Sequence, residues 1–250
     1  MTPERMQCAL RRRLRWPLPL RAAACKGTRC RTRVDSLGDH LASCPRTGLL
    51  KIRSRPLEKA WAQVFREAGA RVTENTFLRD TNLPSISSRD GRRLEIVASG
   101  LPLHRGVPLG VDATMVSPLH ADGSPWPHAA VTNGVAIARA EKSKATTYPE
   151  LVESDRLRLL TLACEVGGRW SQTCLDTVKA LAQARSRQAA PLLRSAAARG
   201  WAARWWALLS VAAQDCLAST LLGDSVVTLG GVVTSEPSLA EVVLDLGDPL

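Results

Sequence analysis

The sequence has no long hydrophobic run. Its longest tryptophan-rich apolar stretch, Trp205 to Ala213, ends at Gln214 and Asp215, whereas a membrane-spanning helix needs about 18 apolar residues or more. The arginines at positions 11–13 are not followed by the apolar segment of a secretory signal. We therefore expect neither a membrane span nor a secretory signal.

The chain also lacks the composition of a disordered, collagen-like or disulfide-based protein. Charged residues make up 23% and hydrophobic residues 45% of its 250 residues, values that are close to globular averages. Its seven cysteines are an odd number, and without secretion we expect them to be reduced. Metal ligation or burial is therefore their expected role, in one large domain or two small ones.

The charge is distributed unevenly along the chain. Lysine and arginine outnumber aspartate and glutamate by 34 to 23, a net charge of +11. Residues 1–71 contain 17 basic and 5 acidic side chains, whereas residues 72–250 contain 17 and 18. A basic segment of this kind predicts a polyanionic partner, because each phosphate that it neutralises releases counterions. The alternative is a solvated basic arm without a specific partner.

Four ligand-type residues lie close together within the basic segment: Cys25, Cys30, His40 and Cys44. A helix over residues 39–43 would place the last two on one face, and Gly27 and Gly38 allow tight turns. Two cysteines in a turn followed by a helical pair are typical of structural zinc sites, where the ion supplies folding energy. The alternative is a set of scattered buried thiols with a surface histidine. Cys8 is a spare candidate ligand.

Hydrophobic periodicity and turn residues predict a mixed α/β core after the basic segment. In chain order we expect a helix over 56–69, strands over 71–78, 93–97 and 110–116, a helix over 128–148 and a strand over 157–166. Three further helices are expected over 171–186, 188–199 and 202–222, where Trp201 and Trp205 belong to an apolar stripe that indicates a core face. A weakly ordered tail follows, in which residues 226–233 have an edge strand as the alternative.

The strands over 93–97 and 110–116 predict an antiparallel hairpin. A hairpin centred between residues 103 and 104 would place Glu95 opposite Asp112 on one sheet face. Apolar pairs would lie on the other face: Leu94 with Ala113 and Ile96 with Val111. Two carboxylates this close repel each other unless one is protonated or a cation lies between them, and Mg²⁺ prefers carboxylate oxygens. The alternatives are ordinary solvated acids, or a bulge that breaks this register.

The helix expected over 128–148 carries a lysine near its end, and Pro149 follows it. Glu141, Lys144 and Tyr148 share one face of this helix, whereas Lys142 points elsewhere. On this pattern alone, a lysine beside a glutamate is more commonly a solvated surface pair than part of a site.

Several segments together carry a resemblance to a known family: Asp35–Cys44 and then residues 53–70, 92–97, 111–118 and 141–151, in this order. The first resembles the Cys/His motif that precedes the C-terminal endonuclease of non-LTR retrotransposon polyproteins. The resemblance implies a restriction-endonuclease-like fold of the PD-(D/E)xK superfamily, with the core order α-β-β-β-α-β. It also implies a motif of two acids, a lysine and a tyrosine, which corresponds here to Glu95, Asp112, Lys144 and Tyr148.

The resemblance implies Mg²⁺-dependent hydrolysis of phosphodiester bonds in DNA at a retroelement target site, in the nucleus. Glu95 and Asp112 would hold Mg²⁺, and Lys144 would position or activate the attacking water. Tyr148 would orient the lysine or contact the phosphate. A structural Zn²⁺ ion would be bound by the basic segment through Cys25, Cys30, His40 and Cys44.

With this resemblance the chain divides into four expected parts. A basic zinc-binding segment covers residues 1–50, an endonuclease core 51–170, a helical extension 171–222 and a weakly ordered acidic tail 223–250. Cys164, Cys174 and Cys216 lie in apolar settings and are expected to be buried thiols.

Two positions depart from the family pattern. The first acid is Glu95 after Leu94, where the family commonly has aspartate, often after proline, and Arg53-Ser54 stands where the family has an Arg-His pair. The reverse-transcriptase region that usually precedes the Cys/His motif is not in this sequence. The alternative function is a catalytically inactive, zinc-containing remnant that binds nucleic acid, either DNA or the RNA of the element. A basic structural protein without nucleic-acid contacts is a third alternative.

Overall fold

The computed structural model describes residues 1–223 apart from 19, 21–23, 82 and 85. The described residues end at 223. The weakly ordered tail expected over 223–250 therefore lies outside them from residue 224 on, as does the alternative strand over 226–233. The α-helices are α1 (Pro3–Arg13), α2 (Asp39–Ser43), α3 (Arg55–Glu67), α4 (Val135–Thr147), α5 (Pro149–Val152), α6 (Gln172–Ser186) and α7 (Arg194–Leu222). The strands are β1 (Arg71–Phe77), β2 (Arg93–Ser99), β3 (Leu109–Val116) and β4 (Arg158–Glu165).

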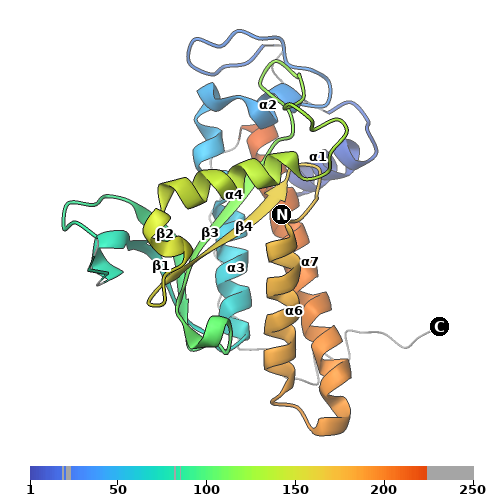
Figure 1. Ribbon diagram of the computed structural model, residues 1–250. Coiled ribbons are helices and arrows are strands. Elements are labelled where there is room, and N and C mark those ends of the chain that lie inside the picture. Colours follow the sequence, from blue (N-terminus) through green and yellow to red (C-terminus); the bar gives the residue numbers. More distant parts are fainter. Residues whose placement is uncertain (19, 21–23, 82, 85, 224–250) are drawn as a thin grey trace.

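A four-stranded sheet in the order β1-β2-β3-β4 lies at the centre of the molecule (Figure 1). The first three strands pair antiparallel, and β4 pairs parallel with β3, because α4 returns the chain to the same edge before β4 begins. The predicted order of helix, three strands, helix and strand is confirmed by α3, β1, β2, β3, α4 and β4. The mixed α/β class and the helical C-terminal part are also confirmed.

The predicted hairpin register is confirmed where β2 and β3 pair. Ile96 lies opposite Val111, and both side chains are fully buried in the main core. Leu94 departs from the prediction, because it packs in a second buried cluster rather than beside Ile96. The pairing described between β2 and β3 begins only at Ile96, so the position of Glu95 lies at the end of the ladder.

Helices cover both faces of the sheet. In Figure 1, α4 crosses in front of the strands and α3 lies behind them. Apolar residues recur at helical spacing along α3, and its buried Trp61 and Phe65 join Val111 of β3 in the main core. The long helix α7 packs along α3, and α1 and α6 pack against α7.

Buried polar contacts fasten α1 and α3 to α7. Arg5 of α1 forms an ion pair with Asp215 of α7 at 3.2 Å, and both side chains are almost inaccessible. Glu67 of α3 accepts hydrogen bonds from the Arg204 guanidinium and, at 2.8 Å, from the indole N–H of Trp205. One hydrophobic cluster contains residues from the basic segment (1–50), the core (51–170) and the helical extension (171–222). These three expected parts therefore share one core.

Some predicted helix boundaries are wrong. The helix expected over 128–148 begins only at Val135, because Gly134 adopts a left-handed conformation (φ 80°) and the residues before it form turns. The helices expected over 188–199 and 202–222 form the single helix α7, which follows a 3-10 turn at Pro191 and continues through Gly200. Gly200 is buried, and its packing offsets the cost of about 1 kcal/mol that glycine carries in a helix. The sequence patterns did not predict α1.

One helical stretch, Pro191–Leu222, is long and apolar enough to cross a membrane by length and composition alone. However, 61% of its most apolar window is buried inside the structure. Trp201, Trp205 and Leu209 of this stretch belong to the main core, which confirms the predicted core face.

Candidate metal centres

The four predicted zinc ligands, Cys25, Cys30, His40 and Cys44, are buried, and their ligand atoms all lie within 4.8 Å of one another. The Sγ atom of Cys44 lies 3.9 Å from that of Cys25 and 3.8 Å from that of Cys30. The Cys30 Sγ lies 3.4 Å from His40 Nε2. A tetrahedral zinc ion separates two sulfur ligands by about 3.8 Å and a sulfur from a nitrogen by about 3.6 Å. The cluster could therefore hold a Zn²⁺ ion, and its thiols are not scattered.

Local turns bring these ligands together. A Cβ atom on Gly27 would lie 2.8 Å from the carbonyl carbon of Arg46, so this turn needs glycine for a close backbone approach. The predicted helix over 39–43 is present as α2, directly after Gly38 in the left-handed conformation (φ 73°). The Asp35 carboxylate accepts hydrogen bonds from the backbone N–H groups of residues 37, 39 and 40, and so satisfies donors at the start of α2.

Contacts outside the ligand set prepare it for a metal. His40 Nδ1 lies 2.5 Å from the backbone oxygen of Ala121, which assigns the proton to Nδ1 and leaves Nε2 facing the sulfurs. Hydrogen bonds from Thr32 lower the pKa of the Cys30 thiol, and the thiolate is the metal-binding form. Cys8, the spare candidate, lies in the main hydrophobic core and outside the group.

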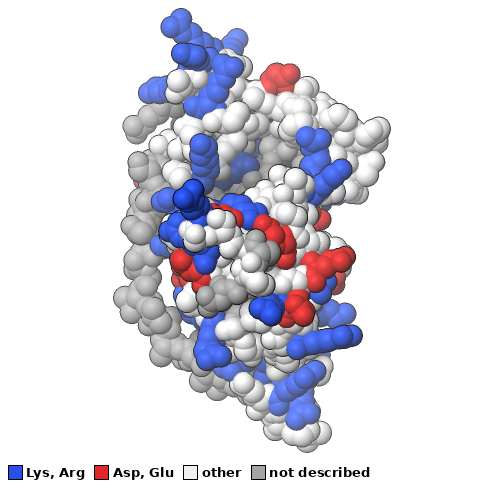
Figure 2. Space-filling view, turned by 60° about the vertical axis from the view of Figure 1, so that its left-hand side comes forward, with Lys and Arg blue, Asp and Glu red and all other residues white. Residues whose placement is uncertain are grey.

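Exposed basic side chains surround the Cys/His centre. In Figure 2, lysine and arginine gather at the end of the molecule formed by the zinc-segment loops, and acidic side chains gather near the middle of that face. We call the exposed basic residues of these loops the basic patch: Lys26, Arg29, Arg31, Arg33 and Arg46. Part of the positive charge of the basic segment therefore lies around the Cys/His centre, and other lysines and arginines lie in the middle and at the opposite end of this face.

The two predicted acids and the lysine converge from three elements. Glu95 of β2 accepts a hydrogen bond from the backbone N–H of Ala113 at 2.6 Å. Its carboxylate thus binds a backbone group of β3 just beyond the point where the backbone pairing of β2 with β3 ends. Asp112 of β3 forms an ion pair with Lys144 of α4, with 2.7 Å between Oδ2 and Nζ. The side chain of Asp112 is only 3% exposed, whereas that of Lys144 is 29% exposed. The lysine is therefore only partly exposed, and its charge lies against a buried carboxylate.

Asp112 has one oxygen atom without a partner. Its Oδ1 atom is buried and has no hydrogen-bond partner among the described residues. Burial raises the pKa of Asp112, and the Lys144 charge opposes this rise. A buried polar atom is normally satisfied, so this oxygen marks a place for a cation or a donor.

A third acid, which sequence analysis did not identify, lies close enough to interact with these two. Burial and the negative charge of Asp112 raise the pKa of Glu58 on α3. Burial, followed by the charges of Asp112 and Glu58, raises the pKa of Glu95 to about 9. The sequence signal for Glu58 is weak, because an acid in the first turn of a helix is common for its interaction with the helix dipole.

The three carboxylates form a looser group than the Cys/His set. The ligand atoms of the Cys/His set all lie within 4.8 Å of one another, and among the described residues the three carboxylates do not form such a group. Even so, Glu58, Glu95 and Asp112 lie close enough for their charges to interact, and Lys144 forms an ion pair with Asp112. Such an excess of like charge favours either protonation or a cation.

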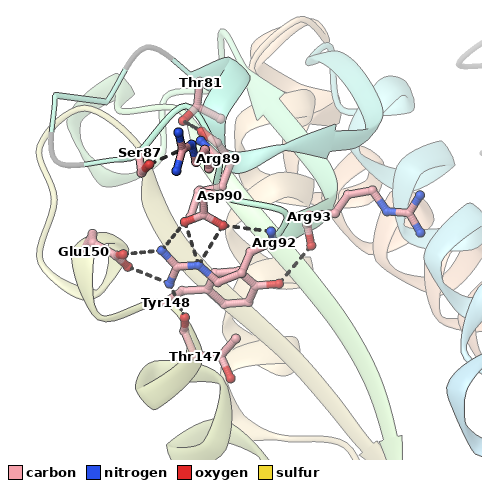
Figure 3. Close-up of polar contacts among 10 residues, drawn as sticks. Thr81, Ser87, Arg89, Asp90, Arg92, Arg93, Thr147, Tyr148 and Glu150 are labelled. Atoms are coloured by element: carbon pink, nitrogen blue, oxygen red, sulfur yellow. Dashed lines mark hydrogen bonds and ion pairs between the residues drawn. The ribbon is translucent and has the colours of Figure 1, made fainter.

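Tyr148 lies at the end of α4, with its hydroxyl group engaged by the backbone. This group donates a hydrogen bond to the backbone oxygen of Arg93 at 2.8 Å (Figure 3). Burial and the charges of Asp112 and Glu95 raise the pKa of Tyr148 to about 12, so the phenol stays neutral. The role that the resemblance implies for Tyr148, to orient Lys144 or to contact the phosphate, stays a prediction.

A network around Arg92 holds the same region together. Figure 3 shows the Arg92 guanidinium between the carboxylates of Asp90 and Glu150. It also donates to the backbone oxygen of Thr147 and lies 5.8 Å from the ring centroid of Tyr148. These contacts fix the end of α4, which carries Lys144, against the start of β2, which carries Glu95.

No model of a protein family matches this chain, and no curated protein matches it either. The resemblance to retrotransposon endonucleases is therefore carried by the residues quoted above. Function has to be argued from the geometry of the sites.

Proposed function

We propose that this chain is a retroelement-derived DNA endonuclease domain with a PD-(D/E)xK core, which hydrolyses phosphodiester bonds with Mg²⁺. The observation that carries this proposal is the convergence of Glu95, Asp112 and Lys144 from β2, β3 and α4. Two acids and a lysine in this order are the motif that the resemblance implies. Side chains far apart in sequence have no local reason to meet in this way.

The residues present fit a magnesium ion. The Asp112 Oδ1 atom is buried without a partner, and carboxylate oxygens are the ligands that Mg²⁺ prefers. Glu95 and Asp112 would hold the ion, with Glu58 as a neighbouring acid. When bound, Mg²⁺ supplies Lewis-acid polarisation of the scissile phosphate.

The side chains of the chain itself supply the remaining functions. Lys144 places a positive charge beside Asp112, where it offsets the negative charge of the phosphate and positions the attacking water. Tyr148 and Arg92 keep the end of α4 in place through the contacts shown in Figure 3. The basic patch at the zinc centre binds the DNA backbone, which is consistent with action in the nucleus.

A nicking assay on supercoiled plasmid with Mg²⁺ tests the assignment. The Asp112→Asn variant removes one carboxylate charge with little change of shape and is expected to lower the nicking rate by at least about 100-fold. Asp155→Asn, at an exposed position, is the matched control and should nick like the parent chain. Unchanged nicking by Asp112→Asn would reject the catalytic assignment.

The second candidate is a nucleic-acid-binding remnant that has lost catalysis. The observation that favours it is Glu95, which replaces the usual aspartate and binds the N–H of Ala113 at 2.6 Å. This candidate predicts salt-sensitive DNA binding by the zinc-loaded chain without cleavage in either Mg²⁺ or Mn²⁺. The same plasmid assay combined with a binding titration therefore separates the two functions.

A further inference from the structure

A cavity of about 270 Å³ lies where the zinc segment, the end of β3 and the first half of α4 meet. Four polar side chains line it: Ser43 of α2, Arg53, Ser117 after β3 and Arg139 of α4. No zinc ligand lines this cavity, nor do the three acids or Lys144. It is therefore distinct from both metal centres, although α2, β3 and α4 connect it to them.

Arg53 brings a buried positive charge to the cavity wall. The residue is 6% exposed and donates hydrogen bonds to the backbone oxygens of Ala42, at 2.6 Å, and Met115. Its Nε atom has no hydrogen-bond partner, and no carboxylate forms an ion pair with it, among the described residues. Burial lowers the pKa of Arg53 to about 10. A buried charge without a counter-ion is unfavourable, so an anion in the cavity would stabilise this residue.

The other polar groups of the cavity are also donors. The Arg139 guanidinium lies 4.0 Å from the ring centroid of Trp126 and has no carboxylate partner among the described ion pairs. The Ser43 hydroxyl lies 2.9 Å from the backbone oxygen of Asp39 and 2.8 Å from the Ser117 Oγ atom, which also accepts a hydrogen bond from a backbone N–H. No acidic side chain lines the cavity. Two guanidinium groups with no acid beside them are the kind of lining that recognises phosphate.

We infer that this cavity binds a phosphate group of the DNA backbone, away from the bond that is cut. The identity of the polyanion rests on the proposed function, whereas the anion site itself follows from the cavity. Ser117 lies five residues beyond Asp112 along β3, which is roughly 17 Å of extended chain. The cavity would thus hold the strand at a second point and fix its register in the site.

Binding of a fluorescent DNA duplex by the full-length, zinc-loaded chain, without Mg²⁺, tests the inference independently of cleavage. Arg139→Gln should weaken binding about tenfold and reduce the slope of log affinity against log salt by about one. Ala140→Leu, which fills the cavity without changing charge, should also weaken binding. Lys142→Gln is the matched control, because it removes one exposed charge from α4 outside the cavity, and it should change the affinity less than twofold.

Two further experiments identify the ligand of the cavity. Neutral methylphosphonate linkages, placed singly along the duplex, should weaken binding at one position away from the nick, and only in the parent chain. Inorganic phosphate should raise the melting temperature of the parent chain but not that of Ala140→Leu. Equal binding by Arg139→Gln, Ala140→Leu and Lys142→Gln would overturn the inference. So would stabilisation by inorganic phosphate with no change in DNA affinity, because the ligand would then be free phosphate.

Discussion

The Cys/His centre and the carboxylate centre are built in opposite ways. At the first, four ligands from one short segment already lie at zinc-like distances, and Ala121 holds the histidine in its metal-binding form. At the second, burial and the charges of Asp112 and Glu58 raise the pKa of Glu95, and Asp112 keeps an oxygen atom without a partner among the described residues. The first is arranged to be filled during folding, whereas the second keeps acids buried in a folded core, where ionisation of Glu95 is unfavourable.

We therefore expect the Cys/His centre to act mainly on stability and the carboxylate centre mainly on chemistry. A structural ion contributes to folding in proportion to its affinity for the folded state, so the Cys/His centre should dominate stability. Perturbed pKa values cluster at functional sites, and the carboxylate centre should therefore cost stability while it serves function. Substitutions at the two centres should have effects of opposite sign on the free energy of unfolding.

The largest effect is expected for Cys44→Ser. This variant should lose bound zinc and should lower the free energy of unfolding by roughly 5 kcal/mol or more, since structural zinc sites contribute on the order of 10 kcal/mol. Metal analysis and urea unfolding measure the two quantities. Cys8→Ala is the control, because Cys8 lies in the core outside the ligand group and should retain one zinc ion per chain. A zinc-free Cys8→Ala chain would contradict the ligand set.

In contrast to Cys44→Ser, Glu95→Gln is expected to raise the free energy of unfolding. The pKa of Glu95 rises from 4.5 to about 9 in the folded chain, so folding takes up a proton and stability falls as pH rises between these values. Glutamine avoids this cost, and the variant should be more stable than the parent at pH 8 by about 2 kcal/mol, with no difference near pH 4. Urea unfolding at both pH values checks this. Glu153→Gln, at an exposed position, should show no such pH-dependent gain.

Divalent-ion binding should release a proton at neutral pH. Because Glu95 is protonated below about pH 9, it has to lose its proton to become a ligand, and affinity for Mn²⁺ should rise up to about tenfold per pH unit. Calorimetry in two buffers of different ionisation enthalpy gives the number of protons released. A heat of binding that is independent of the buffer would argue against Glu95 as a ligand.

The smallest effect is expected for Tyr148→Phe. The loss of its hydrogen bond to Arg93 should lower the free energy of unfolding by about 1 kcal/mol, and the nicking rate should fall less than tenfold. Plasmid nicking and thermal unfolding measure both. A loss of nicking as large as that of Asp112→Asn would instead restore Tyr148 to a direct role at the phosphate.

Local patterns predicted much of this protein correctly. The helix after Pro56, the strands and the zinc ligands followed from periodicity and spacing, because each depends on neighbours within one or two turns of chain. Errors occurred where distant packing decides the outcome. Gly200 is an ordinary place for a helix to end, yet burial against other helices keeps α7 continuous, and α1 is held by a buried ion pair to Asp215.

The sequence by itself determined the order of the elements, the β2–β3 register and which residues could bind zinc, since these depend on short-range spacing. Only the tertiary structure decided that Glu58 lies near enough to affect the pKa of Glu95, that Asp112 has an oxygen unsatisfied among the described residues, and that Arg53 lines a cavity without an acid. Whether a charged side chain is solvated or buried depends on which distant elements cover it. A residue's own neighbours in the chain do not record that information.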